Sequence, residues 1–371
     1  MHIDFAKYLS LEAKLSEREL RKAVEPLYTI TKSTFVRQFI NKEGKFIITL
    51  PIDWYHKNKL FEAKDTDPDS FEFLNEPIGT FQLSLTTKDK GLIPKIIEKH
   101  NIKSQELGRK NLVFAQEFFP SSRFDMFLWF VLVGEQFFMA KYIYDAKNRE
   151  KEIIKKEVDK AKKALETLIF VEEEIRELVL AHFQFDKFMF SLASSQDLTS
   201  KAYKDNKPIE LVVLLANQID AGLRLALILN EQIETKSLFI DIKLIQQKEG
   251  DKVVMEKAIY KLALEKGIID EQLNLELHDL YNKRNKVIHQ YIISDITTKE
   301  VKKISIEYSL MEKRIGEIIK ELEKRQLEEK VGIYGKNPAD SPLTKEQEVY
   351  LQNAIDEKHA DYSFIKSRVE E

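Results

Sequence analysis

The chain has 371 residues, of which 43% are hydrophobic and 33% charged, and its formal net charge is −3. This size and apolar content predict a soluble globular protein with more than one hydrophobic core. The near-neutral balance excludes a global attraction to nucleic acid or anionic lipid, so any such binding has to be local. The absence of cysteine excludes disulfides, thiolate metal sites and cysteine nucleophiles.

The first 20 residues, "MHIDFAKYLSLEAKLSEREL", lack the basic region and the apolar region of a signal peptide. Together with the lack of cysteine, this favours a cytoplasmic location. Residues 1–110 are expected to form a mixed α+β region of unknown role, opening with a helix near residues 9–25. "STFVRQF", "NKEG" and "KFIITL" predict a β-hairpin, and "FEFL" and "TFQLSL" around "NEPIG" predict a second pair of strands.

Residues 111–200 are expected to be helical, because glycine and proline are nearly absent from most of this stretch. "MFLWFVLVG", Met126–Gly134, has roughly half of the ~20 residues that a membrane helix needs, and we interpret it as a core helix. The alternating charges of Lys147–Lys163 predict a solvated helix face. The polar stretch Ser194–Pro208 predicts a boundary between modules.

Residues 209–330 are expected to form a bundle of helices. Pro208 precedes a long apolar helix, and the later segments follow as "SLFIDIKLI", "VVMEKAIYKLALEKG", "LNLELHDLYNKRNKVIHQYII" and a charged helix from Thr298 to Glu329. Residues 331–371 predict a tail with a short helix around Leu351 and Ile355. The expected fold class is therefore mainly α, with a small α+β region at the N-terminus.

Arg284 interrupts the buried face of the predicted helix at residues 277–291. The apolar positions that define this face are Leu277, Leu280, Tyr281, Val287, Ile288 and Tyr291. A guanidinium in such a stripe is unfavourable unless an anionic group meets it. His289 lies about 140° around the helix from Arg284. Asn285, one turn before His289, is placed to bond one ring nitrogen and so fix the tautomer.

Lys283 and Lys286 add to Arg284, so the sequence predicts a local anion site. Arginine, histidine and asparagine, without metal or cysteine, suit the cleavage of an RNA phosphodiester. The histidine would move protons to and from the ribose oxygens, and the arginine would neutralise charge developing on the phosphate. One histidine cannot easily make both transfers, so a symmetric dimer would supply the second.

The R-N-x-x-x-H pattern of Arg284, Asn285 and His289 resembles the signature of the HEPN superfamily of small helical ribonucleases. Tyr291 extends it to R-x4-H-x-Y, which is similar to HEPN toxins paired with nucleotidyltransferase antitoxins. The resemblance implies a four- or five-helix bundle that works as a homodimer, without metal or cofactor, and cleaves tRNA or mRNA as a toxin or antiphage defence effector. It also implies that Tyr291 is a modification target and that an acid on an earlier helix, Asp220 or Glu231, supports Arg284. An antitoxin or regulatory partner is expected, and a membrane partner is not.

Another interpretation needs no catalysis. Arg284 would pair with Asp220, Asp279 or Glu276 and brace the bundle, which would then be a non-catalytic module that binds RNA or protein. Arg176 and His182 in "RELVLAH" have a related spacing, but the glutamates around them would repel phosphate, and we interpret that segment as a surface helix. The motifs of phosphate-binding loops, dinucleotide-binding folds, serine hydrolases and zincins are missing from the sequence.

Overall fold

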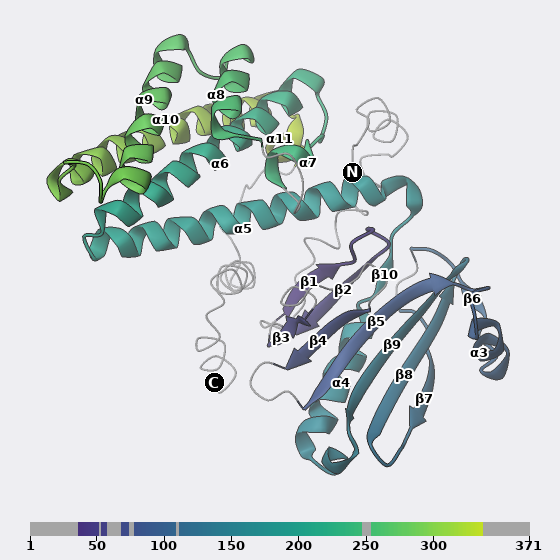
Figure 1. Ribbon diagram of the computed structural model, residues 1–371. Coiled ribbons are helices and arrows are strands. Elements are labelled where there is room, and N and C mark those ends of the chain that lie inside the picture. The colour runs from purple at the N-terminus through teal and green to yellow at the C-terminus, as the bar shows by residue number, and fades with distance from the viewer. Residues whose placement is uncertain are drawn as a thin grey trace. The chain divides into compact units, whose positions relative to one another are not determined.

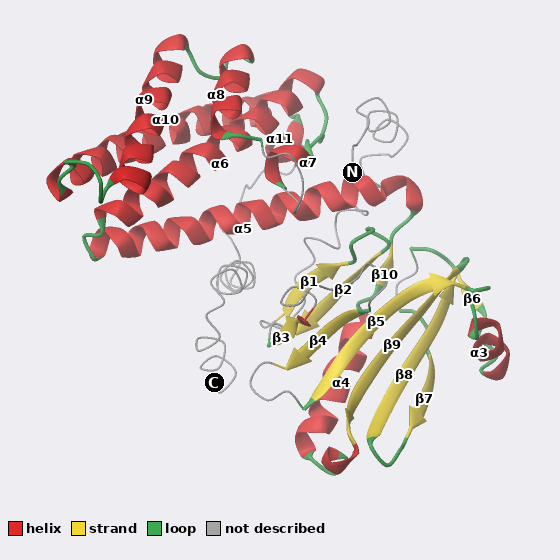
Figure 2. Ribbon diagram, viewed as in Figure 1, coloured by secondary structure: helices red, strands yellow, loops and turns green. Residues whose placement is uncertain are grey.

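The computed structural model describes residues 36–51, 53–57, 68–73, 78–108, 111–246 and 254–336. Helices predominate among these residues and the strands lie in their N-terminal part, so the chain is mainly helical with an N-terminal sheet region (Figures 1 and 2). The described residues divide into two compact units, here called the sheet unit (36–180) and the helical unit (181–336). The helices expected near residues 9–25 and around Leu351 lie outside the described residues.

The predicted hairpin is confirmed as part of a three-stranded sheet in the order β1-β2-β10. Its strands are β1 (Val36–Ile40), β2 (Phe46–Pro51) and β10 (Ile169–Phe170). The Asn41 side chain closes the turn by accepting hydrogen bonds from the backbone N–H groups of Lys45 (2.6 Å) and Phe46 (3.1 Å). Gly44 takes a φ of +69° there, a conformation that favours glycine.

A seven-stranded sheet forms the larger part of the sheet unit, in the order β3-β4-β5-β9-β8-β6, with β7 also paired to β8. The strands are β3 (Trp54–His56), β4 (Asp69–Phe73), β5 (Gly79–Thr87), β6 (Ser104–Gln105), β7 (Ala115–Phe119), β8 (Phe124–Val133) and β9 (Gln136–Asp145). The second predicted strand pair is confirmed, because β4 and β5 pair antiparallel with Phe71 opposite Phe81.

The core helix predicted at Met126–Gly134 is wrong, because these residues form most of β8 and its turn. Phe130 and Leu132 face α3 (Ile93–Lys99), whereas Trp129 and Val131 face the core beneath α4 (Glu152–Glu166). Burial on both faces makes the strand a continuous apolar run, which periodicity cannot distinguish from a buried helix. The helical part of region 111–200 therefore begins near α4.

The charged stretch Lys147–Lys163 forms most of α4, and its lysines lie largely on the exposed side, as predicted. Ile154, Val158 and Ala161 pack into the core of the sheet unit. Glu157 is the exception among the charges, because it is buried and accepts a hydrogen bond from the Trp54 indole N–H at 2.5 Å. Two short 3-10 turns flank this region, at Ala146–Asn148 and Glu173–Ile175.

The two compact units divide between residues 180 and 181, inside helix α5 (Arg176–Lys204), so Ser194–Pro208, the boundary expected from the sequence, lies within the helical unit. The polar side chains at the end of α5 are satisfied within helical structure. Thr199 donates to the Ser195 carbonyl at 2.9 Å, and Gln218 donates to the Thr199 hydroxyl at 2.8 Å. Hydroxyl groups that bond back along their own helix do not end it, although they are also common in turns.

The helices predicted for residues 209–330 are confirmed. They are α6 (Pro208–Thr235), α7 (Ile242–Ile245), α8 (Glu256–Glu265), α9 (Glu271–Gln290) and α10 (Thr298–Glu329), and α11 (Gly332–Lys336) follows. Pro208 begins α6, and a capping box between Thr297 and Glu300 begins α10. Helices α6 and α10 lie side by side (Figure 1), and Gly222 allows their close approach, since a Cβ there would lie 2.8 Å from Ile315.

Within the described residues, α6 is also the helix long and apolar enough to cross a membrane by length and composition. In its most apolar window, 67% is buried inside the protein. Ile219 and Leu223 of α6 pack against residues of α8, α9 and α10, as expected for the central helix of a bundle.

Candidate functional site

Helix α9 carries Arg284 on its inward face, as predicted. The Asp270 side chain caps the helix by accepting a hydrogen bond from the Leu273 N–H at 2.7 Å. Leu277, Leu280 and Val287 are buried, and the guanidinium occupies the gap in their stripe. Ile288 was expected in this stripe but is 43% exposed.

The Arg284 side chain is held on three sides and is only 17% exposed. It forms an ion pair with Glu256 at the start of α8. Its Nη2 donates a hydrogen bond to the Asn285 Oδ1 at 3.2 Å, and its guanidinium lies 4.6 Å from the centroid of the Tyr281 ring. Its buried Nε has no hydrogen-bond partner among the described residues.

Glu256 is a shared acceptor, because the Tyr260 hydroxyl also donates to it. Burial raises the pKa of Tyr260, and the neighbouring Glu256 carboxylate raises it further, so this phenol stays protonated. Burial lowers the pKa of Arg284, but Glu256 more than offsets this, and the net shift is upward. Arg284 and Glu256 therefore stay oppositely charged in a shielded position, where a salt bridge is little screened by water.

The acid that supports Arg284 is thus neither of the two predicted residues. Asp220 accepts a hydrogen bond from Arg224 at 2.7 Å, and Glu231 accepts one from Lys266 at 2.9 Å. Glu256 lies 28 positions before Arg284, and only the packing of α8 on α9 brings the two together. The one sequence signal for it was the four-residue spacing of Glu256 and Tyr260 on a short helix.

The acids considered for a bracing role also bond elsewhere. Asp279 and Glu307 both pair with Lys283, each at 2.7 Å, and Glu276 pairs with Arg314. Lys283 is consequently not a free cation for an anionic ligand, contrary to the prediction. Lys286 is exposed, and of the two lysines it alone is left to add positive charge beside Arg284.

His289 is exposed in the last turn of α9. The predicted bond from Asn285 to His289 is not formed, and the Asn285 amide oxygen instead accepts from Arg284. Within one chain the structure therefore brings Arg284 and Asn285 together but leaves His289 apart. Ile292 and Ile293, directly after α9, are 95% and 82% exposed.

Tyr291 caps the C-terminus of α9 and is half-buried. Its hydroxyl lies 3.1 Å from the Thr298 hydroxyl, at the start of α10. This contact links the two helix ends on either side of the loop that carries Ile292 and Ile293.

His182 was interpreted from the sequence as part of a surface helix, but it is buried. It lies in α5, at the start of the helical unit. Neither ring nitrogen has a hydrogen-bond partner among the described residues, and burial lowers the pKa of His182 to about 4. The ring is therefore neutral at pH 7. In the part of the chain that the structure describes, no group of three or more His, Asp and Glu side chains could hold a metal ion.

No protein-family model matches the sequence, and no curated protein matches it. Among solved structures, a protein of Bacteroides thetaiotaomicron VPI-5482 with a crystal structure at 1.50 Å resolution is 14% identical. The match covers 50% of this chain and 76% of that chain, with a TM-score of 0.28. At this level the likeness does not establish a shared fold.

A double-mutant cycle tests the contact between Arg284 and Glu256. Arg284→Met and Glu256→Gln should each lower the free energy of unfolding by about 2–3 kcal/mol, because each leaves a shielded partner without its counter-charge. The coupling between them should be about 1–3 kcal/mol in denaturant unfolding. The exposed pair Arg314 and Glu276 is the control, and it should couple by less than about 1 kcal/mol. Equal coupling in both pairs would contradict the shielding described here.

His182 should make stability depend on pH. Its pKa is 6.5 in a model peptide and about 4 in the folded protein, so the folded state binds the proton less readily. Its contribution is present above pH 6.5 and is lost as pH falls toward 4, by up to about 3 kcal/mol. Burial raises the pKa of the nearby Asp186 to about 7, so Asp186 also changes stability with pH. Comparing the free energy of unfolding of the wild type and of His182→Leu at pH 7 and pH 4.5 isolates the contribution of His182. Parallel pH profiles of the two proteins would contradict it.

Proposed function

We propose that the helical unit is an HEPN-like, metal-independent endoribonuclease that cleaves tRNA or mRNA. The observation that carries the proposal is the arrangement on α9. Arg284 is held by an acid from an earlier helix and by Asn285, while His289 is exposed further along the same helix. An acid in this supporting position is what the resemblance to the HEPN superfamily implies, although the residue is Glu256.

The division of roles follows from the chemistry of the two side chains. His289 would act as general base toward the ribose 2′-hydroxyl or as general acid toward the leaving 5′-oxygen. Arg284 would stabilise the charge that develops on the phosphate. A guanidinium has five N–H donors, and the contacts with Glu256 and Asn285 use two nitrogens, Nη1 and Nη2. The products would carry 2′,3′-cyclic phosphate and 5′-hydroxyl ends.

A second copy of the chain would complete the site. Ile292 and Ile293, beside His289, are far more exposed than isoleucine normally is. Burying them against the same segment of a partner would be favourable, and a two-fold axis there would bring two copies of His289 near one phosphate. Each histidine could then perform one of the two proton transfers.

The cellular role that this activity suggests is that of a toxin or antiphage defence effector in the cytoplasm. Cleavage of the cell's own tRNA or mRNA stops growth, so such an enzyme requires control by an antitoxin or another regulatory partner. Tyr291, whose hydroxyl contacts Thr298 close to the exposed loop, is the candidate site for modification by that partner.

The second candidate function is a non-catalytic helical module that binds RNA or protein. The contact between Arg284 and Glu256 favours it, because the charge of the arginine is neutralised within one chain. In that case the arginine would hold α8 on α9, and His289 would be a solvated helix residue.

RNA cleavage in EDTA separates the two functions. The wild-type chain should cut tRNA or mRNA, and His289→Ala should reduce the rate by about 100-fold or more, as loss of a general acid or base does. Gln290→Ala, which changes the exposed neighbour, should keep the wild-type rate. If His289→Ala cuts as fast as the wild type, or the wild type does not cut, the nuclease proposal fails and the binding module stands.

The dimer is tested by charge at its expected contact. Ile292→Asp with Ile293→Asp should convert a dimer to a monomer in sedimentation velocity and should abolish cleavage, because burying a carboxylate without a partner is unfavourable. Leu275→Asp is the control, because Leu275 is 63% exposed near the opposite end of α9. A wild type that is already monomeric and yet cuts RNA would contradict the two-copy site.

A further inference from the structure

The seven-stranded sheet has one face that the described helices leave largely uncovered. Its other face packs against α4, through residues such as Trp129, Val131 and Tyr142. On the uncovered face, α3 covers only the end formed by Phe130, Leu132 and Phe137. Figure 2 shows β5, β9, β8 and β7 side by side, with α3 beside the end of the sheet.

Alternation along the strands and the register between them place a defined set of side chains on that face. Phe119 lies opposite Met126, Met126 opposite Ile143, and Lys141 opposite Gln82. Phe124 shares the face with Met126 because it lies two residues earlier on β8. The open sheet face is here defined by Gln82, Phe119, Phe124, Met126, Lys141 and Ile143.

Two aromatic rings on this face are exposed, and a cation lies over each of them. Phe119 is 44% and Phe124 43% exposed. The Lys99 Nζ lies 5.6 Å from the centroid of Phe119, and the Arg123 guanidinium lies 4.9 Å from the centroid of Phe124. A flat ring next to a cation matches a nucleotide, which offers a flat base next to a phosphate.

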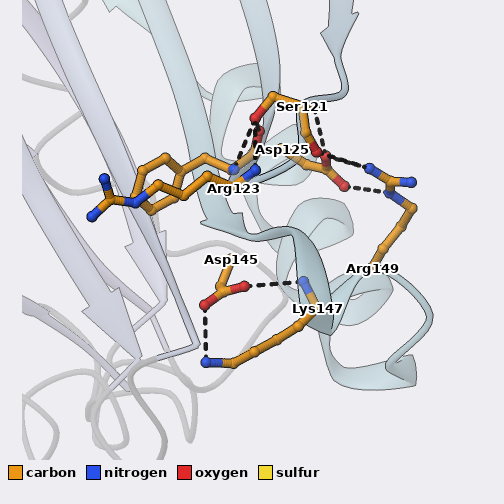
Figure 3. Close-up of polar contacts among 7 residues, drawn as sticks. Ser121, Arg123, Asp125, Asp145, Lys147 and Arg149 are labelled. Carbon is orange, nitrogen blue, oxygen red and sulfur yellow. Dashed lines mark hydrogen bonds and ion pairs between the residues drawn. The ribbon is translucent and has the colours of Figure 1, made fainter.

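The turn that presents Phe124 is rigidly built. The Ser121 hydroxyl accepts hydrogen bonds from the N–H groups of Arg123 (3.3 Å) and Phe124 (2.9 Å). The fully buried Asp125 accepts two bonds from Arg149, at 2.6 and 2.7 Å, and these hydrogen bonds lower the pKa of its carboxyl. In Figure 3 the Arg123 side chain extends to the side opposite Arg149, and Arg123 is exposed.

The charges around the open sheet face favour an anionic ligand. Its nearby carboxylates already have cationic partners, since Glu117 contacts Lys99 and His100, Glu72 contacts Lys57, and Asp145 contacts Lys147. Arg123 and Lys141 form no ion pair with any carboxylate in the described ranges. Arg123 lies over the exposed Phe124 ring and near Asp145, and Lys141 lies on the same sheet face, so in a chain with a net charge of −3 this face carries two cations outside ion pairs that can attract phosphate.

We propose that the open sheet face binds single-stranded nucleic acid. Bases stack on Phe119 and Phe124, and backbone phosphates lie at Arg123 and Lys141. A single strand fits because its bases are free to stack, whereas the bases of a duplex are stacked on one another. This binding site goes beyond the proposed nuclease, because it lies in the sheet unit and uses none of the residues of α9.

The test uses the full chain carrying His289→Ala, so that the probe is not cut if the nuclease proposal is right. Fluorescence anisotropy of labelled oligouridine and oligothymidine, about 12 nucleotides long, measures the Kd for RNA and for DNA. Phe119→Ala with Phe124→Ala should raise the Kd at least tenfold, and Arg123→Ala with Lys141→Ala should raise it and flatten its dependence on salt.

Phe118→Ala is the matched control. Phe118 is 43% exposed on the same strand as Phe119, but it faces the opposite side of the sheet, where it packs on Phe127. The Kd of the Phe118→Ala variant should stay within twofold of that of the His289→Ala parent. Circular dichroism should show that all variants are folded. Tighter binding of one oligonucleotide than the other identifies RNA or DNA as the ligand.

Four outcomes would overturn the proposal: no binding of either single strand, equal binding of a duplex, an equal loss of affinity in Phe118→Ala, or an unchanged Kd in Phe119→Ala with Phe124→Ala. These outcomes are independent of the nuclease. If the wild type cuts RNA while Phe119→Ala with Phe124→Ala leaves the Kd unchanged, the open sheet face is not the binding site and the nuclease stands. If the open sheet face binds the single strand but the wild type does not cut RNA, the nucleic-acid site stands and the nuclease proposal fails.

Discussion

The ion pair between Arg284 and Glu256 joins the start of α8 to the second half of α9. A shielded guanidinium without a counter-charge is unfavourable. The pair therefore favours the packing of α8 on α9 that brings Glu256 to Arg284. The same contact places the Tyr260 hydroxyl against the carboxylate and the Tyr281 ring against the cation. Any chemistry at α9 therefore starts from an arginine whose position is fixed but whose charge is already compensated.

Most of the helical unit could be predicted from the sequence because its signals are local. Proline before α6, the capping residues of α10 and the 3.6-residue period of α9 depend only on neighbours along the chain. Strand β8 could not be predicted, since burial between α3 and α4 removes the alternation that marks a strand. The length of α5 could not be predicted either, because its hydroxyl groups also suit a turn and only the structure shows them bonded within a helix.

The candidate site was predictable only in part, for a related reason. Periodicity showed that Arg284 points inward and needs an acid, but the identity of that acid depends on how α8 crosses α9, which no spacing encodes. The competition for Asn285 was equally hidden. Its amide was expected to hold His289, but its oxygen accepts from the guanidinium one residue away and no bond to His289 forms. The exposure of Phe119 and Phe124 on one sheet face could not be predicted, because residues 111–200 were expected to be helical and the alternation along β7 and β8 decides which rings are exposed.

The seam between the two units is a continuous helix. α5 leaves one compact unit at residue 180 and enters the other at residue 181 without a loop, and its residues on both sides of that point, including Val179 and Ala181, are buried. Modules joined by loops can be exchanged between genes at little structural cost. Here an exchange has to cut a continuous hydrogen-bonded helix and keep its register. An insertion or deletion of one residue rotates every following side chain about the helix axis by about 100°.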